Sequence, residues 1–376
     1  MNKMARLASL LAKADIEIDG GRPWDIQIKD DRAVRRILSE PSLGAGESYM
    51  EGYWECARLD EFFFRVLRGL KPKEIYHFTT LFVYWLKNFF INPQSPRYSK
   101  RVAEQHYNID NELYIAMLGK SMAYTCAYWR NAQTLDEAQF AKYDLICRKL
   151  NLHADEKVLE LGCGFGGFAK YAAENYGVSV VGINISSEQL RYARGACRNL
   201  PIQFFECDYR DVKRYNPDRI RFDKVVSIGL SEHVGYQNYR QFLQIARENL
   251  QEDGLFLLHT IAKNFSHHFS DPWIQKYIFP HGMLPTLKMI TGLSEPYFIT
   301  EDVHNIGADY DKTLMAWDHN FENSWPSLCS RHDERFRRMW RYYLLSCAGG
   351  FRARTMQLYQ LVLSPRGVLD GYRSIR

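Results

Sequence analysis

Four side chains with acid–base chemistry stand at informative places in this chain. Glu232, in the segment GLSEHVG, follows an apolar run, and His259 ends the next apolar run in FLLHTIA. Tyr310 lies in GADYDKT after a later run, and Cys126 lies in MAYTCAYW ahead of them all. Because the carboxyl ends of parallel strands converge on one crevice, we expect Glu232 and His259 to face the same pocket.

Each of these residues also has a purely structural interpretation. Glu232 can cap the segment that follows it, and His259 can be a hydrogen-bonded core histidine. Cys126 can be a small buried apolar side chain, and Tyr310 can be ordinary packing. A glutamate and a histidine at adjacent strand ends favour catalysis more than either does alone, and the residues by themselves leave both interpretations open.

A glycine-rich turn follows the first apolar strand, in KVLELGCGFGG. Glycines let the backbone approach a ligand, and the helix that follows offers unpaired N–H groups. Gly162, Gly164 and Gly167 fit the dinucleotide pattern GxGxxG. Gly162, Gly164 and Gly166, preceded by Glu160, fit the turn of methyltransferases that use S-adenosylmethionine. The turn alone predicts a nucleoside cofactor without naming it.

The ends of the next two strands favour S-adenosylmethionine. A dinucleotide site needs an acidic residue about 20 positions after the glycines, and Asn184 stands there instead. Asn184 and Gln189 can still bond ribose hydroxyls. Asp208, after the third strand, can accept a hydrogen bond from an adenine amino group, although it can also be a plain helix cap.

These residues are positioned by a predicted α/β fold with a doubly wound parallel sheet. Apolar strands alternate with helices, which is typical of parallel sheets covered on both faces. The expected strands are residues 157–161, 178–183, 202–206, 223–228 and 254–260. The expected helices between them are residues 167–176, 187–199 and 238–250. Beyond them we expect a helical insertion at 271–295, a strand near 297–303, a long helical stretch at 312–346 and a last strand at 357–364.

The N-terminal part is predicted to be a mainly helical domain of residues 1–91. Helices are expected at 4–14, 33–40, 59–70 and 75–90, with a compact turn-rich stretch at 42–55. The helix at 75–90 is aromatic and contains a lysine, which fits packing inside the domain or a surface that meets lipid. Residues 92–100 hold two prolines and form the predicted linker to a catalytic domain of residues 101–376.

Composition narrows the class of protein. The net charge of +5 over 376 residues is too small to indicate nucleic-acid binding. The eight cysteines are scattered without zinc spacing, so no metal is expected and a reducing, cytoplasmic protein is predicted. No signal peptide is visible, and the most apolar run, residues 75–91, is shorter than the roughly 18–20 residues of a membrane span.

Ten segments in order closely resemble cyclopropane fatty acyl phospholipid synthases of the long, two-domain bacterial type. They are LGAGESYMEGYWE, EQHYNIDNELY, MAYTCAYW, LELGCGFGGFAKY, GINISSEQ, SIGLSEHVG, FLLHTI, DPWIQKYIFPHGMLP, HNIGADYDKTLMAW and CAGGFRAR. The resemblance implies a class I, Rossmann-like methyltransferase fold. It also implies that a cis double bond of a phospholipid acyl chain attacks the activated methyl of S-adenosylmethionine, and that a cyclopropane ring closes after proton loss.

The resemblance also implies a bound bicarbonate ion as the base. Its cage would be Cys126, Glu232, His259, Tyr310 and the backbone at Ile261. The cofactor-binding residues implied by the family pattern are Tyr124, Thr125, Glu160, Gly162, Gly164, Asn184, Gln189, Asp208, Tyr209 and Arg210. A homodimer, peripherally associated with the inner face of the membrane through the N-terminal domain, is the implied state.

Three rival functions remain. A related lipid methyltransferase would make methyl-branched chains on the same fold. A non-catalytic scaffold would bind cofactor at a membrane, but the candidate catalytic residues are all in place. A nucleic-acid methyltransferase would need a basic module, and the sequence shows none.

Overall fold

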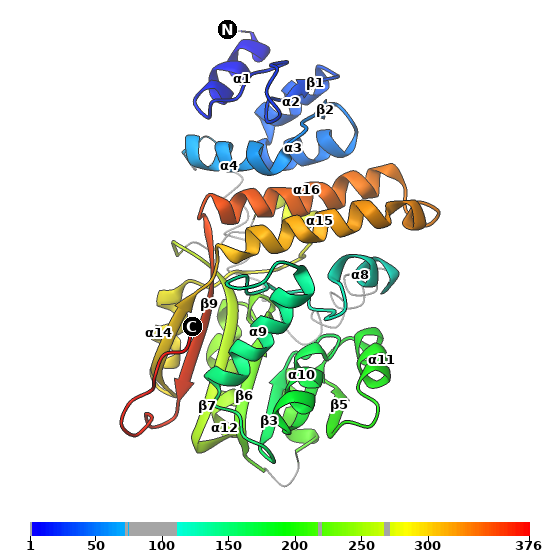
Figure 1. The fold of residues 1–376 in the computed structure, drawn as a ribbon. Helices are drawn as coiled ribbons and strands as arrows, with labels where there is room; N and C mark the ends of the chain where they lie inside the picture. The colour runs from blue at the N-terminus through cyan, green and yellow to red at the C-terminus, as the bar shows by residue number, and fades with distance from the viewer. Residues whose placement is uncertain (1, 72–73, 75–110, 217–219, 267–270) are drawn as a thin grey trace. The chain divides into compact units, whose positions relative to one another are not determined.

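The computed structural model describes residues 2–71, 74, 111–216, 220–266 and 271–376 (Figure 1). The chain forms two compact units. The first comprises residues 1–91, 267–282 and 310–356, and the second comprises residues 92–266, 283–309 and 357–376. The predicted helix at 75–90 and the predicted linker at 92–100 lie outside the described residues.

A seven-stranded sheet organises the second unit, in the order β5-β4-β3-β6-β7-β9-β8. Its strands are β3 Lys157–Leu161, β4 Ser179–Asn184, β5 Ile202–Glu206, β6 Phe222–Ile228, β7 Leu250–Lys263, β8 Ile299–Asn305 and β9 Met356–Ser364. Strands β3 to β7 pair in parallel, as predicted. Strands β8 and β9 pair antiparallel, so the sheet is mixed where a parallel sheet was predicted.

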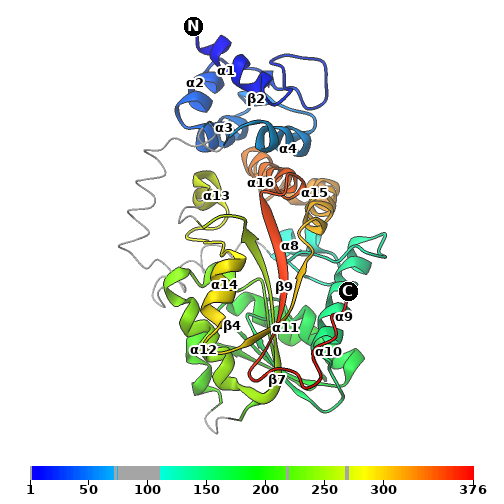
Figure 2. The same ribbon diagram turned by 90° about the vertical axis from the view of Figure 1, so that its left-hand side faces the viewer.

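Helices cover both faces of this sheet, which Figure 2 shows edge-on with α9 and α10 on one side and α12 and α14 on the other. The helices of the unit are α8 Asn111–Leu118, α9 Leu135–Lys149, α10 Gly167–Tyr176, α11 Ser187–Ala196, α12 Tyr239–Asn249 and α14 Leu287–Ser294. The short 3-10 helices are η1 Tyr209–Arg214, η2 Ser231–His233 and η3 Tyr236–Asn238. One apolar core lies on each face, so the inner strands are buried on both sides. The doubly wound α/β class is therefore confirmed.

The first unit is mainly helical. Its elements are α1 Lys3–Ala12, β1 Gln27–Ile28, α2 Arg32–Ser39, α3 Pro41–Met50, β2 Trp54–Glu55, α4 Leu59–Gly69, α13 Pro272–Tyr277, α15 Asp309–Leu328 and α16 Glu334–Arg352. Helices α4 and α16 approach closely at Gly349, where a Cβ atom would lie 2.5 Å from the Asp60 carbonyl oxygen. The N-terminal segment thus shares a core with helices from much later in the chain.

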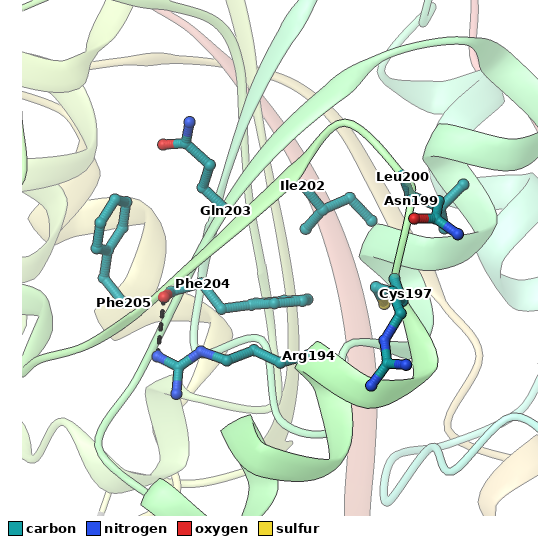
Figure 3. A pocket seen from close by; sticks show the side chains of 9 residues that line it. Arg194, Cys197, Asn199, Leu200, Ile202, Gln203, Phe204 and Phe205 are labelled. Carbon is teal, nitrogen blue, oxygen red and sulfur yellow. Dashed lines mark hydrogen bonds between the residues drawn. The ribbon is translucent and has the colours of Figure 1, made fainter.

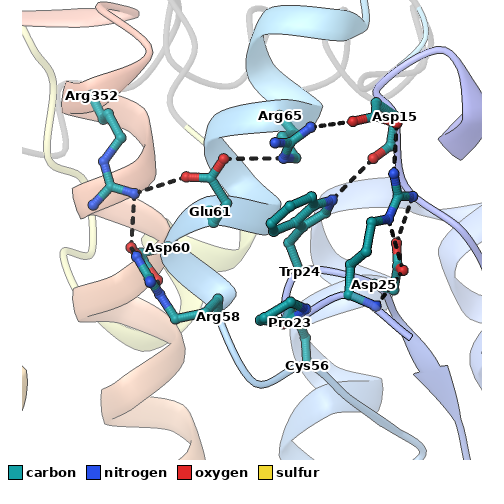
Figure 4. Close-up of polar contacts among 11 residues, drawn as sticks. Asp15, Pro23, Trp24, Asp25, Cys56, Arg58, Asp60, Glu61, Arg65 and Arg352 are labelled. Atoms are coloured by element: carbon teal, nitrogen blue, oxygen red, sulfur yellow. Dashed lines mark hydrogen bonds and ion pairs between the residues drawn. The ribbon is translucent and has the colours of Figure 1, made fainter. Parts of the chain in front are cut away.

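Buried ion pairs add to this packing. Arg352 bonds Asp60 at 2.7 Å, and Asp60 also pairs with Arg58 at 2.8 Å (Figure 4). Arg352 also bonds Asp311 at 2.9 Å. These pairs hold the pKa of Asp60 at about 2, against the opposing effect of its burial.

The prediction of a turn-rich stretch at 42–55 was wrong for its first half. Residues Pro41–Met50 form helix α3, which begins at a proline in the first helical turn. The glycines that suggested turns serve helix packing instead: a Cβ at Gly44 would lie 2.1 Å from the Arg36 carbonyl oxygen, and one at Gly46 would lie 2.2 Å from the Trp273 ring. Close packing has overridden the low helix propensity of glycine.

Three further observations concern the described residues only. Among them, no helix has the length and apolar character needed to cross a bilayer. The same residues hold no cluster of three or more potential metal ligands. No disulfide joins any of the eight cysteines, all of which lie in described segments.

Candidate active site

The glycine turn after β3 has a backbone conformation that residues with a side chain rarely adopt. Gly162, Gly164 and Gly166 all have positive φ, at 82°, 52° and 79°. The N–H groups of Gly162 and Cys163 both donate to the Ile183 carbonyl at 3.0 Å, which ties the turn to the end of β4. A Cβ at Gly164 would meet nothing within 4 Å, so there is open space beside this residue. Such a turn leaves backbone N–H groups at the start of α10 available to a ligand.

Asn184 and Gln189 meet beside this turn. The Asn184 amide nitrogen donates to the Gln189 Oε1 at 2.8 Å and to the Gly164 carbonyl at 3.3 Å. Its oxygen accepts from the Ile185 N–H at 2.8 Å. Ser186 caps α11 through the Gln189 N–H, so both amides lie in a fixed frame at the end of β4.

Asp208 and Arg210 form a bidentate pair after β5, with both oxygen–nitrogen distances at 2.7 Å. Asp208 also caps η1 through the Arg210 N–H at 3.0 Å, so the cap interpretation of Asp208 holds locally. Tyr209 faces the apolar core instead, with its ring 5.5 Å from Phe242. Its buried hydroxyl has no hydrogen-bond partner among the described residues.

Glu160 is a nearly buried carboxyl group at the end of β3. It is 2 % exposed, and one of its oxygens, Oε2, has no partner within the described part of the chain. Burial raises the pKa of Glu160, and the charge on Lys142 opposes this rise. An unsatisfied carboxylate oxygen beside a glycine turn fits a cationic ligand group, such as the amino group of S-adenosylmethionine.

Tyr124 and Thr125 lie on the segment that precedes α9. The Tyr124 ring packs 5.3 Å from Tyr114, which packs 5.7 Å from Phe165 in the glycine turn. The methyl group of Thr125 abuts Gly229, where a Cβ would lie only 2.7 Å away. Both residues therefore lie in the same unit as the glycine turn and are linked to it or to the end of β6 by direct packing.

Glu232 and the Ile261 backbone are brought together at the ends of β6 and β7. The Ile261 N–H donates to the Glu232 Oε1 at 2.7 Å. Burial raises the pKa of Glu232 to about 7, although the Ile261 N–H favours the charged form. The Glu232 main chain is fixed as well, because its carbonyl accepts from the Met283 N–H at 2.9 Å.

His259 lies on β7 opposite Ile228 and is 1 % exposed. Its Nδ1 lies 3.3 Å from the Gln360 amide nitrogen on β9. With that nitrogen donating, the ring proton sits on Nε2, which has no partner among the described residues. Burial holds the pKa of His259 well below its usual range, and the charges on Lys142 and Lys149 lower it further. The ring is thus a neutral donor suited to an oxyanion.

Cys126 and Tyr310 lie in different units. Cys126 is fully buried in the second unit, with its Sγ 3.2 Å from the Ala127 carbonyl oxygen. Tyr310 belongs to the first unit, where its ring stacks on Phe351 at 4.4 Å.

Comparisons with known proteins identify the family of this chain. Residues 94–361 match the family model described as mycolic acid cyclopropane synthetase. The chain belongs to this family. It is 47% identical over 369 residues to the cyclopropane-fatty-acyl-phospholipid synthase of Escherichia coli K12, an alignment that covers 98% of this chain and 94% of that one. The predicted family and enzyme class are confirmed.

Solved structures of mycolic acid cyclopropane synthases share the fold. The cyclopropane synthase MmaA2 from Mycobacterium tuberculosis matches with a TM-score of 0.65 at 26% identity, over 70% of this chain and 97% of that chain. The mycolic acid cyclopropane synthase CmaA1, complexed with SAH and CTAB, matches with a TM-score of 0.64 at 28% identity, with the same coverage. The chain is an S-adenosylmethionine-dependent methyltransferase with the class I fold, as predicted.

Three polar residues that contact the candidate site were not predicted from the sequence. Gln360 contacts His259 from the last strand, and Gln139 and Lys142 contact Thr125 from α9. The signal for the last two is weak but present, because both occupy positions of AQFAKYDLI that share a helix face with buried residues.

A cavity of about 440 Å³ lies apart from these residues, along α11 and β5 (Figure 3). It is lined by Arg194, Cys197, Arg198, Asn199, Leu200, Ile202, Gln203, Phe204 and Phe205. None of the predicted site residues of this family member lines it. We therefore do not assign it to the cofactor or to the substrate.

Proposed function

We propose that this enzyme transfers a methylene from S-adenosylmethionine across the cis double bond of phospholipid acyl chains to form a cyclopropane ring. The observation that carries the proposal is the likeness to the E. coli cyclopropane-fatty-acyl-phospholipid synthase over 98% of this chain. The buried Glu232 and His259 at neighbouring strand ends support it, because ring closure needs a proton acceptor in a dry pocket.

The cofactor is proposed to lie against the glycine turn. S-adenosylmethionine supplies an activated methyl group whose positive charge passes to the alkene. Glu160 would hold its cationic amino group, and Gly162 and Gly164 would admit its chain. Asn184 and Gln189 would bond its ribose, while Tyr124, Thr125, Asp208 and Arg210 would complete its surroundings.

The proton acceptor is proposed to be a bicarbonate ion, which supplies a base of suitable size beside the cationic substrate. Cys126, Glu232 and His259 of the second unit, with the backbone at Ile261, would hold it. The Nε2–H of His259 suits an oxyanion, and Glu232, with its raised pKa, can share a proton with one. The Ile261 N–H already donates a hydrogen bond to the Glu232 carboxyl group. The role of the Ile261 backbone would therefore be to orient Glu232.

Mass spectrometry of lipids tests the reaction. Purified enzyme is incubated with S-adenosylmethionine and vesicles of a cis-monounsaturated phospholipid, with saturated phospholipid as the matched control. A gain of one CH2 with loss of the double bond is expected, in the unsaturated lipid only. A methylated, uncyclised product would favour the methyl-branching alternative. No mass change with enzyme that binds cofactor would overturn the proposal.

Removal of bicarbonate tests the base. The reaction is run in buffer purged of carbon dioxide, and bicarbonate is then added back. We expect activity to fall on purging and to return on addition. Full activity in purged buffer would argue against a bicarbonate base while leaving the methyl transfer itself intact.

We also propose that the enzyme is a cytoplasmic homodimer that contacts the inner face of the membrane peripherally, through residues 1–91. The aromatic and basic residues at 71–90 support lipid contact. Cosedimentation with vesicles and analytical ultracentrifugation test the two states separately. A monomer that stays in the supernatant would contradict both.

A further inference from the structure

Lys142 is a buried amine on helix α9. Its side chain is fully buried, and its Nζ donates to the Thr125 Oγ1 and to the Gln139 Oε1, each at 2.8 Å. The same amine lies 4.4 Å from the centre of the Tyr143 ring. No carboxylate among the described residues forms an ion pair with it. Burying an amine without an ion-pair partner costs free energy of folding. The hydrogen bonds to the Thr125 and Gln139 oxygens therefore have to offset that cost.

Gln139, one turn earlier on α9, acts on the same segment. Its amide nitrogen donates to the Thr125 carbonyl at 2.9 Å and to the Ala123 carbonyl at 3.4 Å. Gln139 and Lys142 therefore hold both the main chain and the hydroxyl of Thr125. The Thr125 methyl abuts Gly229. The hydrogen bonds from Gln139 and Lys142 therefore fix the spacing between the 123–126 segment and the end of β6.

The charge on Lys142 also reaches the candidate active site. It lowers the pKa of Glu160 against the effect of burial, and it helps to depress the pKa of His259. Burial lowers the pKa of Lys142 itself, while Cys126 and Glu160 favour its charged form. Burial still raises the pKa of Glu160 to about 8, so the charge on Lys142 offsets only part of that rise, whereas on His259 it acts in the same direction as burial.

We propose that Lys142 is a positioning residue of the cofactor pocket, where it fixes the Thr125 hydroxyl beside the end of β6. This inference rests on the proposed cofactor role of Thr125. A role in packing alone is the alternative, and α9 offers a control for it. Lys149, two turns later, is equally buried, but it pairs with Asp302 at 3.5 Å and makes no contact with Thr125.

The test compares Lys142→Met with Lys149→Met in the full chain. Both variants should lose thermal stability, because each removes a buried polar contact. Only Lys142→Met should weaken the affinity for S-adenosylhomocysteine, by roughly tenfold in calorimetry. Equal affinity in Lys142→Met, Lys149→Met and the parent would overturn the inference, since packing alone would then explain Lys142.

The pH dependence of binding gives a second readout. A cationic cofactor needs an ionised Glu160, so affinity falls as pH drops through the pKa of that carboxyl. Without the Lys142 charge this pKa rises, and the fall in affinity should begin at higher pH. A profile in Lys142→Met that coincides with that of the parent would contradict the charge role.

A further variant covers the case in which Lys142→Met does not fold. Gln139→Leu removes the partner of Lys142 and the bonds to the Thr125 carbonyl, and it should weaken cofactor affinity in the same direction. Unchanged affinity in folded Gln139→Leu would overturn the inference. Since the readout is cofactor binding, it is independent of lipid product: a parent that binds cofactor but leaves lipid unchanged refutes the proposed reaction alone.

Discussion

The Glu232 Oε1 accepts a hydrogen bond of 2.7 Å from the Ile261 N–H, which joins the turn after β6 to the end of β7. The bond fixes the orientation of a nearly buried carboxyl group. A side chain from one strand end is thus oriented by the backbone of the neighbouring strand. Parallel strands place such groups together even though 29 residues separate them in the chain.

Glu232→Gln should lower turnover by about 100-fold or more while leaving cofactor affinity unchanged. The amide keeps the shape of the side chain, but it cannot take up a proton. Lipid product formation and calorimetry with S-adenosylhomocysteine measure the two effects. Glu174→Gln, on an exposed part of α10, is the control and should behave like the parent. Full activity in Glu232→Gln would remove Glu232 from the proposed site.

The free energy of unfolding should depend on pH because of Glu232. Its folded-state pKa of about 7 lies above the ordinary value of 4.5, so its contribution is fully present below pH 4.5 and is lost as pH rises through 7. Between pH 4.5 and pH 7 the free energy of unfolding of the parent should fall by on the order of 3 kcal/mol relative to that of Glu232→Gln. Denaturant unfolding of both proteins from pH 5 to pH 8 measures the difference. Parallel pH profiles would mean that Glu232 titrates normally.

The strands that carry the site were predictable because buried parallel strands are continuous apolar runs. The strand before Gly162 and the one before Glu232 appeared within a residue of their predicted places. Helix α3 was missed because its glycines were taken as turn signals, whereas they admit a carbonyl and a tryptophan ring from neighbouring segments. Such contacts are long-range, and no local pattern records them.

The partners of the site residues were harder to predict than the site residues themselves. Lysine on a helix is usually solvated, so the helix face that Lys142 shares with buried residues is only a weak signal for it. Gln360 lies on the last strand, 101 residues from His259, and only the sheet order brings the two together. Both contacts depend on tertiary structure, which local sequence patterns do not predict.

Gln360→Leu should lower turnover about tenfold with little change in cofactor affinity. The leucine removes the group that lies 3.3 Å from the His259 Nδ1, and the imidazole loses the partner that fixes its tautomer. Steady-state kinetics on vesicles and calorimetry separate the two quantities. Gln357→Leu, on the same strand and bonded to Asn264 instead, is the matched control. Equal turnover in both variants would show that Gln360 does not orient His259.

Arg352→Met should destabilise the first unit by on the order of 2 kcal/mol. It leaves the buried Asp60 paired with Arg58 and removes two hydrogen bonds to Asp311. Because the pKa of Asp60 is depressed, the stabilisation is present above pH 3.8 and is lost as pH falls toward 2. Denaturant unfolding at pH 7 measures the loss. Arg335→Met, which breaks an exposed pair with Glu51, should cost much less, and equal losses would contradict the buried-pair argument.

Gly162→Val should abolish cofactor binding. Gly162 has φ of 82°, a backbone that valine adopts only with strain of about 1–3 kcal/mol. Its Cβ would also lie 3.0 Å from the Leu230 Cβ, so the turn would shift between β3 and the segment that leads to Glu232. Either the backbone leaves the positive-φ region or Leu230 moves, and both displace the N–H groups of the proposed cofactor site.

Calorimetry with S-adenosylhomocysteine measures the effect of Gly162→Val, and circular dichroism checks that the variant is folded. Gly195→Ala is the matched control, because Gly195 lies inside α11 and a Cβ there would meet nothing within 4 Å. Alanine at that position should preserve affinity and should stabilise the helix by up to about 1 kcal/mol. Undiminished affinity in a folded Gly162→Val variant would mean that the cofactor does not lie against this turn, because no valine fits there without moving the backbone.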